Sequence, residues 1–404
     1  MVPKLEAKPY LLENKIQHYA WGNRGEKALI PQLLEIEPEN DKPYAELWIG
    51  AHPKAPSKIR INDNQYPLDQ AIQEQSNFIL GPKVSKKFAG RLPFLLKVLS
   101  AGEALSIQTH PNKATAQKLH KKDPEHYPDD NHKPEIAIAI DSLKALVGFR
   151  PIKEIGSMLK NYPEIASFIG DQVCQKFQKT SENESQKLQH LFSKMMNKAD
   201  ASSQKLQETC RQLKKKIENR SAINKRDQLF LELHEKYGND IGLLVIYFLN
   251  MVELQKGQGV FLDAGVPHAY LKGNIIECMA NSDNVVRAGL TPKFIDIPTL
   301  VEITDYATGK PEIQNSSTGG NSIKYNVPAE EFNIQKYNIK EKHQKEYEAG
   351  GSLEILFILS GKLQIIAHSE QLPICRGQTV LIPAGLERYR LESISKAEVF
   401  RVTI

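Results

Sequence analysis

The chain has 404 residues, of which 40% are hydrophobic and 25% are charged, so it can hold two or three domains with cores of their own. Its formal net charge of +5 is slight for this length, and no basic stripe interleaved with aromatic residues is present. These features give no indication of a nucleic-acid-binding protein and are compatible with an anionic small substrate. The N-terminus lacks an apolar signal region and no run is long enough to span a bilayer, so we expect a cytoplasmic protein without a membrane partner.

The cysteines of this chain do not predict disulfides or a metal site. The four cysteines lie far apart and form no Cys-x-x-Cys pair: Cys174, Cys210, Cys278 and Cys375. This spacing excludes a disulfide framework and a zinc site built from cysteine.

Residues 1–151 contain short apolar runs separated by loops rich in proline and glycine, which predicts strands joined by irregular connections. One of these runs, "LPFLLKVLSA", leads into "LSIQTHP", residues 105–111. In that stretch Gln108 and His110 stand two positions apart. Side chains at positions i and i+2 of a strand share one face, so both are expected to point the same way. The fragment alone favours a strand end whose polar face meets water.

A second polar residue heads the run "EIAIAI". Alternation puts Glu135, Ala137 and Ala139 on one face of this strand and three isoleucines on the other. The isoleucines predict a packed layer, and the alanines leave room beside the carboxylate. A strand packed closely against a neighbour would show the same pattern.

Residues 152–250 differ in character and predict a helical insertion. Apolar residues recur at three- and four-residue spacing in "IKEIGSMLK", "SQKLQHLFSKMMNKA", "SSQKLQETCRQLKKKIEN" and "DQLFLELHEKYG". The run of three lysines at positions 214–216 is explained by a solvated helix face.

Strand character returns over residues 251–320 and, after a linker-like stretch at residues 310–322, in an all-β tail over residues 321–404. Within the tail, "EILFILSGKLQIIAH" predicts a hairpin that turns at Ser360, Gly361 and Lys362. We therefore expect a mainly β chain with an α insertion: a discontinuous domain of residues 1–151 and 251–320, the insertion 152–250, and a C-terminal domain 321–404.

An internal repeat links the last two β regions. "KGQGVFLDAGVPHAYL" (256–271) aligns without a gap with "RGQTVLIPAGLERYRL" (376–391), so that His268 corresponds to Arg388. This strand, glycine turn and strand resemble the second motif of cupin-type jelly rolls, in which the residue after the turn is often a metal-binding histidine. The first copy has that histidine and the second does not, which predicts metal in the first roll alone.

Four polar side chains could then converge inside one barrel and bind Zn²⁺ with a coordination position left open: Gln108, His110, Glu135 and His268. Their spacing over 160 residues (268 − 108) does not prove the site.

Long motifs carry a family resemblance: "HYAWG", "AELWIGAHPKAPS", "LPFLLKVLSAGEALSIQTHP", "HKPE", "GVPHAY" and "ECMANSDNVVRAGLTPKFIDIPTL". Together they resemble type I mannose-6-phosphate isomerases of the cupin superfamily, whose fold is a pair of cupin-like jelly rolls with an inserted helical domain. The resemblance implies one Zn²⁺ per chain on the four residues above. It also implies a sugar-phosphate substrate, interconversion of mannose 6-phosphate and fructose 6-phosphate through an enediol, and a role in GDP-mannose metabolism. We expect a monomer.

The resemblance also assigns pocket residues. Arg287 in "NVVRAG" matches the active-site arginine, and Lys133 and Asp283 match polar residues that line the pocket. The proton-transferring base is open between Lys133, Asp283 and His132. Lys97 and Ser106 are candidates for binding phosphate, although Lys97 fits a solvent-facing strand position equally.

Two other functions share parts of this pattern. An iron oxygenase of the cupin type usually has two histidines and one carboxylate, without an amide ligand, and metal identity would separate it. A sugar-binding jelly roll without activity has no need of Arg287 or an open metal position, and turnover of any hexose phosphate would exclude it.

Overall fold

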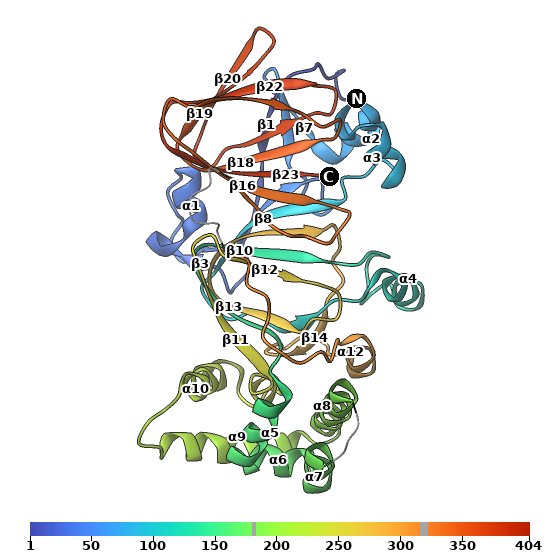
Figure 1. Cartoon of the computed structure of the whole chain (residues 1–404), viewed down its shortest axis with the longest axis vertical. Helices are drawn as coiled ribbons and strands as arrows, with labels where there is room; N and C mark the ends of the chain where they lie inside the picture. Colours follow the sequence, from blue (N-terminus) through green and yellow to red (C-terminus); the bar gives the residue numbers. More distant parts are fainter. Residues whose placement is uncertain (180–182, 316–321) are drawn as a thin grey trace.

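The computed structural model, described here for residues 1–179, 183–315 and 322–404, has three parts arranged along its longest axis. A C-terminal jelly roll stands at one end, a first jelly roll lies in the middle, and a helical region occupies the other end (Figure 1). The expected linker at residues 310–322 lies partly outside the described residues, because 316–321 are not among them.

The first roll is built on a nine-stranded sheet. Six strands follow one another in the spatial order β11 (Leu249–Gln255), β10 (Glu135–Phe149), β13 (His268–Ala280), β8 (Phe94–Ala101), β5 (Glu46–Gly50) and β2 (Lys15–Gln17). Three more join at the side: β12 (Gly259–Leu262) pairs with β10, and β9 (Ile107–Thr109) pairs with both β13 and β14 (Val286–Gly289). The long strands β10 and β13 bend at register shifts, which helps the sheet to curl on itself.

The two faces of β10 do what alternation predicts. Ile136 and Ile138 pack into a core shared with the second roll, whereas Ala137 and Ala139 belong to a separate cluster inside the first roll. The small side chains therefore line the interior of the roll beside Glu135.

The second roll has an eight-stranded sheet that includes strands from the N-terminus. Its spatial order is β15 (Ser322–Lys324), β16 (Asn333–Ile339), β23 (Ala397–Thr403), β18 (Glu354–Ser360), β21 (Thr379–Ile382), β1 (Tyr10–Glu13), β6 (Lys58–Ile61) and β7 (Asn64–Pro67). The sequence predicted that residues 1–151 belong to the first roll. In the structure three strands of this segment, β1, β6 and β7, join the sheet of the second roll instead. Tyr10 and Leu12 are buried in the shared core, and that burial holds β1 against β21.

The predicted hairpin in the tail is wrong. Its first strand, β18, lies in the eight-stranded sheet, and its second lies in a four-stranded sheet ordered β17 (Gln344–Glu348), β22 (Arg388–Ser393), β19 (Lys362–Ala367) and β20 (Glu370–Cys375). Gly361, at φ 91°, turns the chain from one sheet of the sandwich to the other. A small two-stranded sheet, β3 (Asn23–Arg24) with β4 (Pro43–Tyr44), completes the β structure of the described residues.

The helical insertion is confirmed. Its helices are α5 (Ile152–Asn161), α6 (Pro163–Ile169), α7 (Asp171–Lys179), α8 (Glu184–Ala201), α9 (Ser203–Glu218), α10 (Lys225–Tyr237) and α11 (Gly242–Val245). Their apolar faces form one core with the near end of the first roll. In the residues that the structure describes, no helix is long and apolar enough to cross a membrane.

Several helices outside the insertion were missed by the strand-and-loop prediction. They are a 3₁₀ turn (Gly25–Lys27), α1 (Leu29–Leu34), α2 (Leu68–Leu80), α3 (Pro82–Lys87), α4 (Lys113–Lys122) and α12 (Ile297–Ile303). The sequence of α2 does carry a helical signal, since Leu68, Ala71 and Ile72 share one buried face.

The internal repeat is a structural repeat as well. Strands β12 and β21 begin at Gly259 and Thr379, and β13 and β22 begin at His268 and Arg388, each pair 120 residues apart (379 − 259 and 388 − 268). Arg388 itself is exposed, so it does not face the interior of the second roll.

Candidate metal centre

Three predicted ligands meet inside the first roll. His110 follows β9, Glu135 begins β10 and His268 begins β13, and their ligand atoms all lie within 4.8 Å of one another. Glu135 Oε1 is 3.0 Å from His268 Nε2, and Glu135 Oε2 is 3.7 Å from His110 Nε2. All three side chains are buried.

Backbone carbonyls set the orientation of both imidazoles. His110 donates from Nδ1 to Asn284 O at 2.8 Å, and His268 donates from Nδ1 to Val266 O at 2.9 Å. Because Nδ1 carries the proton in each ring, both Nε2 atoms present lone pairs toward Glu135. This arrangement is the one in which two neutral histidines ligate a metal.

Two buried atoms at this point lack a hydrogen-bond partner: His110 Nε2 and Glu135 Oε2. Leaving buried acceptors without a partner costs free energy, so such atoms in a native site call for an explanation, and metal ligation is one. Two imidazole nitrogens and a carboxylate are donors that suit Zn²⁺, and three protein ligands leave room for more. The residues therefore fit a metal.

The pKa values agree with this donor set. Burial, together with the charge of Lys133, lowers the pKa of His110 to about 4, so the ring is neutral near pH 7. For Glu135, burial raises the pKa, but Lys133 and the two histidines outweigh it and hold the pKa well below its usual value. The site therefore presents an ionised carboxylate and a neutral imidazole.

Gln108 stands in register between two of the other predicted residues. On β9 it pairs with His268 of β13 on one side and with Arg287 of β14 on the other. Its Nε2 lies 3.3 Å from His268 Nε2, so the amide borders the cluster. A half-turn about the last side-chain bond would present the amide oxygen in place of the nitrogen.

Arg287 faces the same side of the sheet as Gln108, because directly opposed residues in an antiparallel pair share a face. It is half-buried, and burial lowers the pKa of its guanidinium. Within the described ranges no carboxylate pairs with it. A cation without a partner beside the cluster is available to a ligand.

The three candidates for the base have different surroundings. Lys133 is buried, with Nζ 3.3 Å from Glu135 Oε2. Asp283 lies 2.7 Å from Lys54 Nζ and 3.4 Å from His52 Nε2, and these groups hold its pKa below the usual value although burial raises it. His132 bonds through Nε2 to a carboxylate of the second-roll segment, Glu331, at 2.6 Å.

Lys97 and Ser106, the residues considered for phosphate, are placed differently from each other. Lys97 is buried on β8, 3.0 Å from Glu277 and 3.6 Å from Glu46, and these carboxylates raise its pKa against the effect of burial. It is therefore not a solvent-facing strand residue, and two carboxylates already neutralise it. Ser106 is half-buried, directly before β9.

Sequence reasoning missed residues that support the ligands. Tyr270 donates its hydroxyl to Glu135 Oε1 at 3.3 Å, and its position two residues after His268 on one strand face could have revealed it. The carbonyls of Val266 and Asn284 could not be found this way, because a backbone acceptor leaves no side-chain signature. Asn284 is buried and donates its amide to Asp129 O and Asn131 O at 2.8 and 2.9 Å, which fixes the loop that orients His110.

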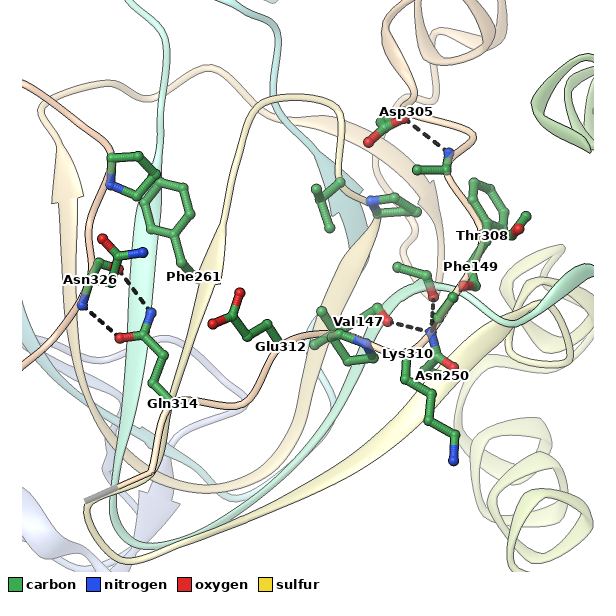
Figure 2. Close-up of a pocket in the computed structure, with 17 residues that line it drawn as sticks. Val147, Phe149, Asn250, Phe261, Asp305, Thr308, Lys310, Glu312, Gln314 and Asn326 are labelled. Atoms are coloured by element: carbon green, nitrogen blue, oxygen red, sulfur yellow. Dashed lines mark hydrogen bonds between the residues drawn. The ribbon is translucent and has the colours of Figure 1, made fainter. Parts of the chain in front are cut away.

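A hollow of about 310 Å³ lies beside the first roll's strands β10 and β12, and its lining does not include the cluster. Figure 2 shows Asn250 anchoring the segment that crosses this face, with Nδ2 within hydrogen-bond distance of four carbonyls, including Val147 O and Gly309 O. Val266 and Pro267, which precede His268, form part of its wall. The backbone that leads into His268 therefore borders a hollow whose wall is held together by Asn250.

Comparisons with known proteins agree with this geometry. Three family descriptions match: "Phosphomannose isomerase type I, catalytic domain" at residues 10–152, "Phosphomannose isomerase type I, helical insertion domain" at 165–249, and "Mannose-6-phosphate isomerase, cupin domain" at 321–404. Mannose-6-phosphate isomerase from Mus musculus is 42% identical over 396 residues, 92% of each chain.

Solved structures of similar shape carry related names. A mutant of phosphomannose isomerase from Salmonella typhimurium superposes with a TM-score of 0.87 at 32% identity, covering 98% of this chain and 99% of that one. A zinc-bound mannose 6-phosphate isomerase superposes with a TM-score of 0.85 at 31% identity and the same coverage. The similarity extends over all three parts of the chain.

Proposed function

The chain belongs to the type I phosphomannose isomerase family, and we propose that it interconverts D-mannose 6-phosphate and D-fructose 6-phosphate with one Zn²⁺ per chain. The observation that carries the proposal is the buried cluster of His110, Glu135 and His268, in which two ligand atoms have no hydrogen-bond partner. A solved structure of a similar protein is zinc-bound. Gln108 is proposed as the fourth ligand, through its amide oxygen.

We propose an enediol route for the reaction. A base removes the proton from C2 of the aldose and returns a proton to C1, while a hydroxyl proton moves from O2 to O1, so the ketose forms without gain or loss of atoms. A bound Zn²⁺ would supply Lewis-acid polarisation of a sugar oxygen next to the reacting carbons. Arg287, always cationic and without a carboxylate partner among the described residues, would stabilise the enediolate oxygen.

Two side chains are proposed to take part in the proton transfer. Asp283 is ionised, since its pKa is lowered by His52 and Lys54, and so has a lone pair to offer. Lys133 is fixed beside Glu135 and could move a proton only by giving up that ion pair. Exchange of the C2 proton with deuterated solvent separates them, because only loss of the true base abolishes exchange while substrate still binds.

We propose Ser106 and His132 as substrate-binding residues, with Ser106 as the candidate for phosphate. Lys97 is a weaker candidate, because Glu277 and Glu46 surround its ammonium group. Its charge instead fastens three strands of the nine-stranded sheet: β5, β8 and β13.

The remaining proposals concern organisation and role. We propose three functional units: a catalytic unit of residues 1–151 and 251–320, the insertion 152–250, and a metal-free roll over 321–404, whose sheet is extended by strands from the N-terminal part of the catalytic unit. We also propose a cytoplasmic monomer without nucleic-acid or membrane partners, which supplies mannose phosphate for GDP-mannose formation.

A coupled assay tests the activity directly. Mannose 6-phosphate should be converted to fructose 6-phosphate by the purified chain, and a chelator should abolish turnover until Zn²⁺ is added back. Turnover that persists after metal analysis shows complete removal would contradict the role of zinc. Failure to convert any hexose phosphate would contradict the proposed function.

A further inference from the structure

A polar pocket lies where the first roll joins the helical insertion. The chain enters the insertion at Arg150 and leaves it at Tyr247, and both residues line a pocket of about 380 Å³. The wall also contains one side of α5, the start of α10 and Tyr162. None of the ten lining residues belongs to the metal centre described above.

Positive charge exceeds negative charge in this pocket. Arg150, Lys153 and Arg226 line it, and Glu154 is the only carboxylate among its lining residues. That carboxylate is engaged by Arg150, from Nη2 at 3.0 Å and Nε at 3.1 Å. Ser157, Asn161 and Asn224 add neutral polar groups.

The guanidinium of Arg226 lacks a carboxylate counter-ion among the described residues. Its Nη1 donates to the carbonyls of Ile246 and Leu249, and no carboxylate pairs with it in the described ranges. The contacts with these carbonyls use one of its three nitrogens, which leaves Nε and Nη2 for another acceptor. Burial and the neighbouring charge of Arg150 lower the pKa of this guanidinium to about 10, which shows that its environment opposes the charge.

We propose that this pocket binds the phosphate group of a small molecule, through Arg226 and Lys153 with Arg150 beside them. A guanidinium has the planar donor pair that matches a phosphate, and a dianion would neutralise the excess charge. Met158, Tyr162 and Tyr247 provide an apolar wall for an organic part of the ligand.

The position suggests what such a ligand would do. Arg150 directly follows β10, the strand that begins with Glu135 and pairs with His268 through Val147. Arg226, in the first turn of α10, donates to the carbonyls of Ile246 and Leu249, on the segment that returns to the roll. A phosphate bound to both would fasten the insertion to the strand that carries a metal ligand, so that binding should raise the stability of the insertion.

Titration calorimetry on the full, zinc-loaded chain tests the proposal, with inorganic phosphate and glycerol 3-phosphate as separate probes. Ser157→Glu keeps both arginines and their carbonyl contacts but adds a negative charge to the lining, and it should weaken one class of binding site at least tenfold. Arg226→Gln should remove the same class. Arg211→Gln is the matched control, because Arg211 is exposed and pairs with Glu208 on the same insertion.

A crystal grown with each probe locates the anion, which separates this site from the metal centre. Density between Arg226 and Lys153 supports the proposal, and tighter binding of glycerol 3-phosphate than of phosphate identifies an organic phosphate as the ligand. Equal or tighter binding of inorganic phosphate identifies the free ion. Density only at the metal centre, with unchanged calorimetry for Ser157→Glu, would overturn the proposal.

Discussion

The two jelly rolls place a glutamate at the same point and use it differently. Glu135 begins β10 and pairs with Leu262, and Glu354 begins β18 and pairs with Ile382, which is 120 residues beyond Leu262 (382 − 262). Both carboxylates are buried. In the first roll two histidine nitrogens approach the carboxylate, whereas in the second roll a guanidinium binds it.

The partner of Glu354 is Arg401. Its Nε donates to Glu354 Oε2 at 2.7 Å, its Nη2 donates to Oε1, and Tyr389 donates to Oε2 at 2.7 Å. These bonds give both carboxylate oxygens a partner, and the guanidinium occupies the side that a metal would need. Glu135, by contrast, keeps an oxygen without a hydrogen-bond partner.

The residues that follow each glutamate show the same division. Ala137 and Ala139 follow Glu135 on the inner face of the first roll, where Leu356 and Ile358 follow Glu354 in the second. Small side chains leave space beside a reactive group, and large ones fill the interior and stabilise it. One scaffold thus serves chemistry in one copy and packing in the other.

The largest effect is expected from the histidine that the second roll lacks. His268→Ala should release the metal and lower kcat more than a hundredfold, because even groups that only orient metal ligands are worth 10–100-fold. Arg388→Ala, at the repeated position, should spare both because its side chain is exposed. Metal analysis and the coupled assay on both variants check this, and equal losses would contradict the division between the rolls.

Substitutions at the buried ion pair of the second roll should change the stability of the protein and not its kcat. Arg401→Met leaves the Glu354 carboxylate buried without its counter-ion, which should lower the free energy of unfolding by about 3–5 kcal/mol. Replacing both residues, with Glu354→Leu and Arg401→Met, should recover most of this loss. Denaturant unfolding measures it, and a large fall in kcat of the folded Arg401→Met protein would show that the second roll takes part in catalysis.

The arginine of the first roll should behave in the opposite way. Arg287 has no carboxylate partner among the described residues, so Arg287→Ala should change stability little but lower kcat by about 10²–10³. Arg287→Lys tests geometry, because lysine keeps the charge without the planar fork. Steady-state kinetics decide the role: a raised KM with unchanged kcat would move Arg287 to phosphate binding.

Acid should lower the free energy of unfolding of the metal-free protein, because His110 becomes protonated more readily in the unfolded chain. The folded pKa of about 4 lies below the ordinary value of 6.5, so the unfolded chain takes up the proton first as pH falls. The contribution of neutral His110 to the free energy of unfolding is fully present above pH 6.5 and is lost as pH falls through about 4. Between pH 6.5 and 4.5 the free energy of unfolding should therefore fall by about 2–3 kcal/mol. Unfolding of metal-free protein across this range measures it. His110→Gln should flatten the slope, and an unchanged slope would contradict the assignment.

Local rules account for what could be predicted from the sequence. Strand alternation correctly placed Ile136 and Ile138 in one core and Ala137 in another, and the gapless repeat matched the strand starts of both rolls. Which sheet a strand joins is decided by distant partners. For that reason the sequence does not reveal that β1 joins the sheet of the second roll, or that Gly361 turns the chain between two sheets and not within a hairpin.

The same limit applies to the site. Alternation predicted that Gln108 and His110 share a face. The ligand atoms of His110, Glu135 and His268 lie within 4.8 Å of one another, and the Gln108 amide lies 3.3 Å from His268 Nε2. The groups that orient His110 and His268 are backbone carbonyls, whose positions depend on loop geometry and not on residue type. The burial of Lys97 between two carboxylates depends in turn on the pairing of β8 with β5 and β13.

Metal content per chain tests the central claim most directly. Purified protein, loaded with Zn²⁺ and dialysed, should contain close to one equivalent, and His268→Ala should contain close to none while Arg388→Ala keeps one. Two equivalents in the parent, or one equivalent that survives His268→Ala, would contradict the claim that the first roll alone holds the metal.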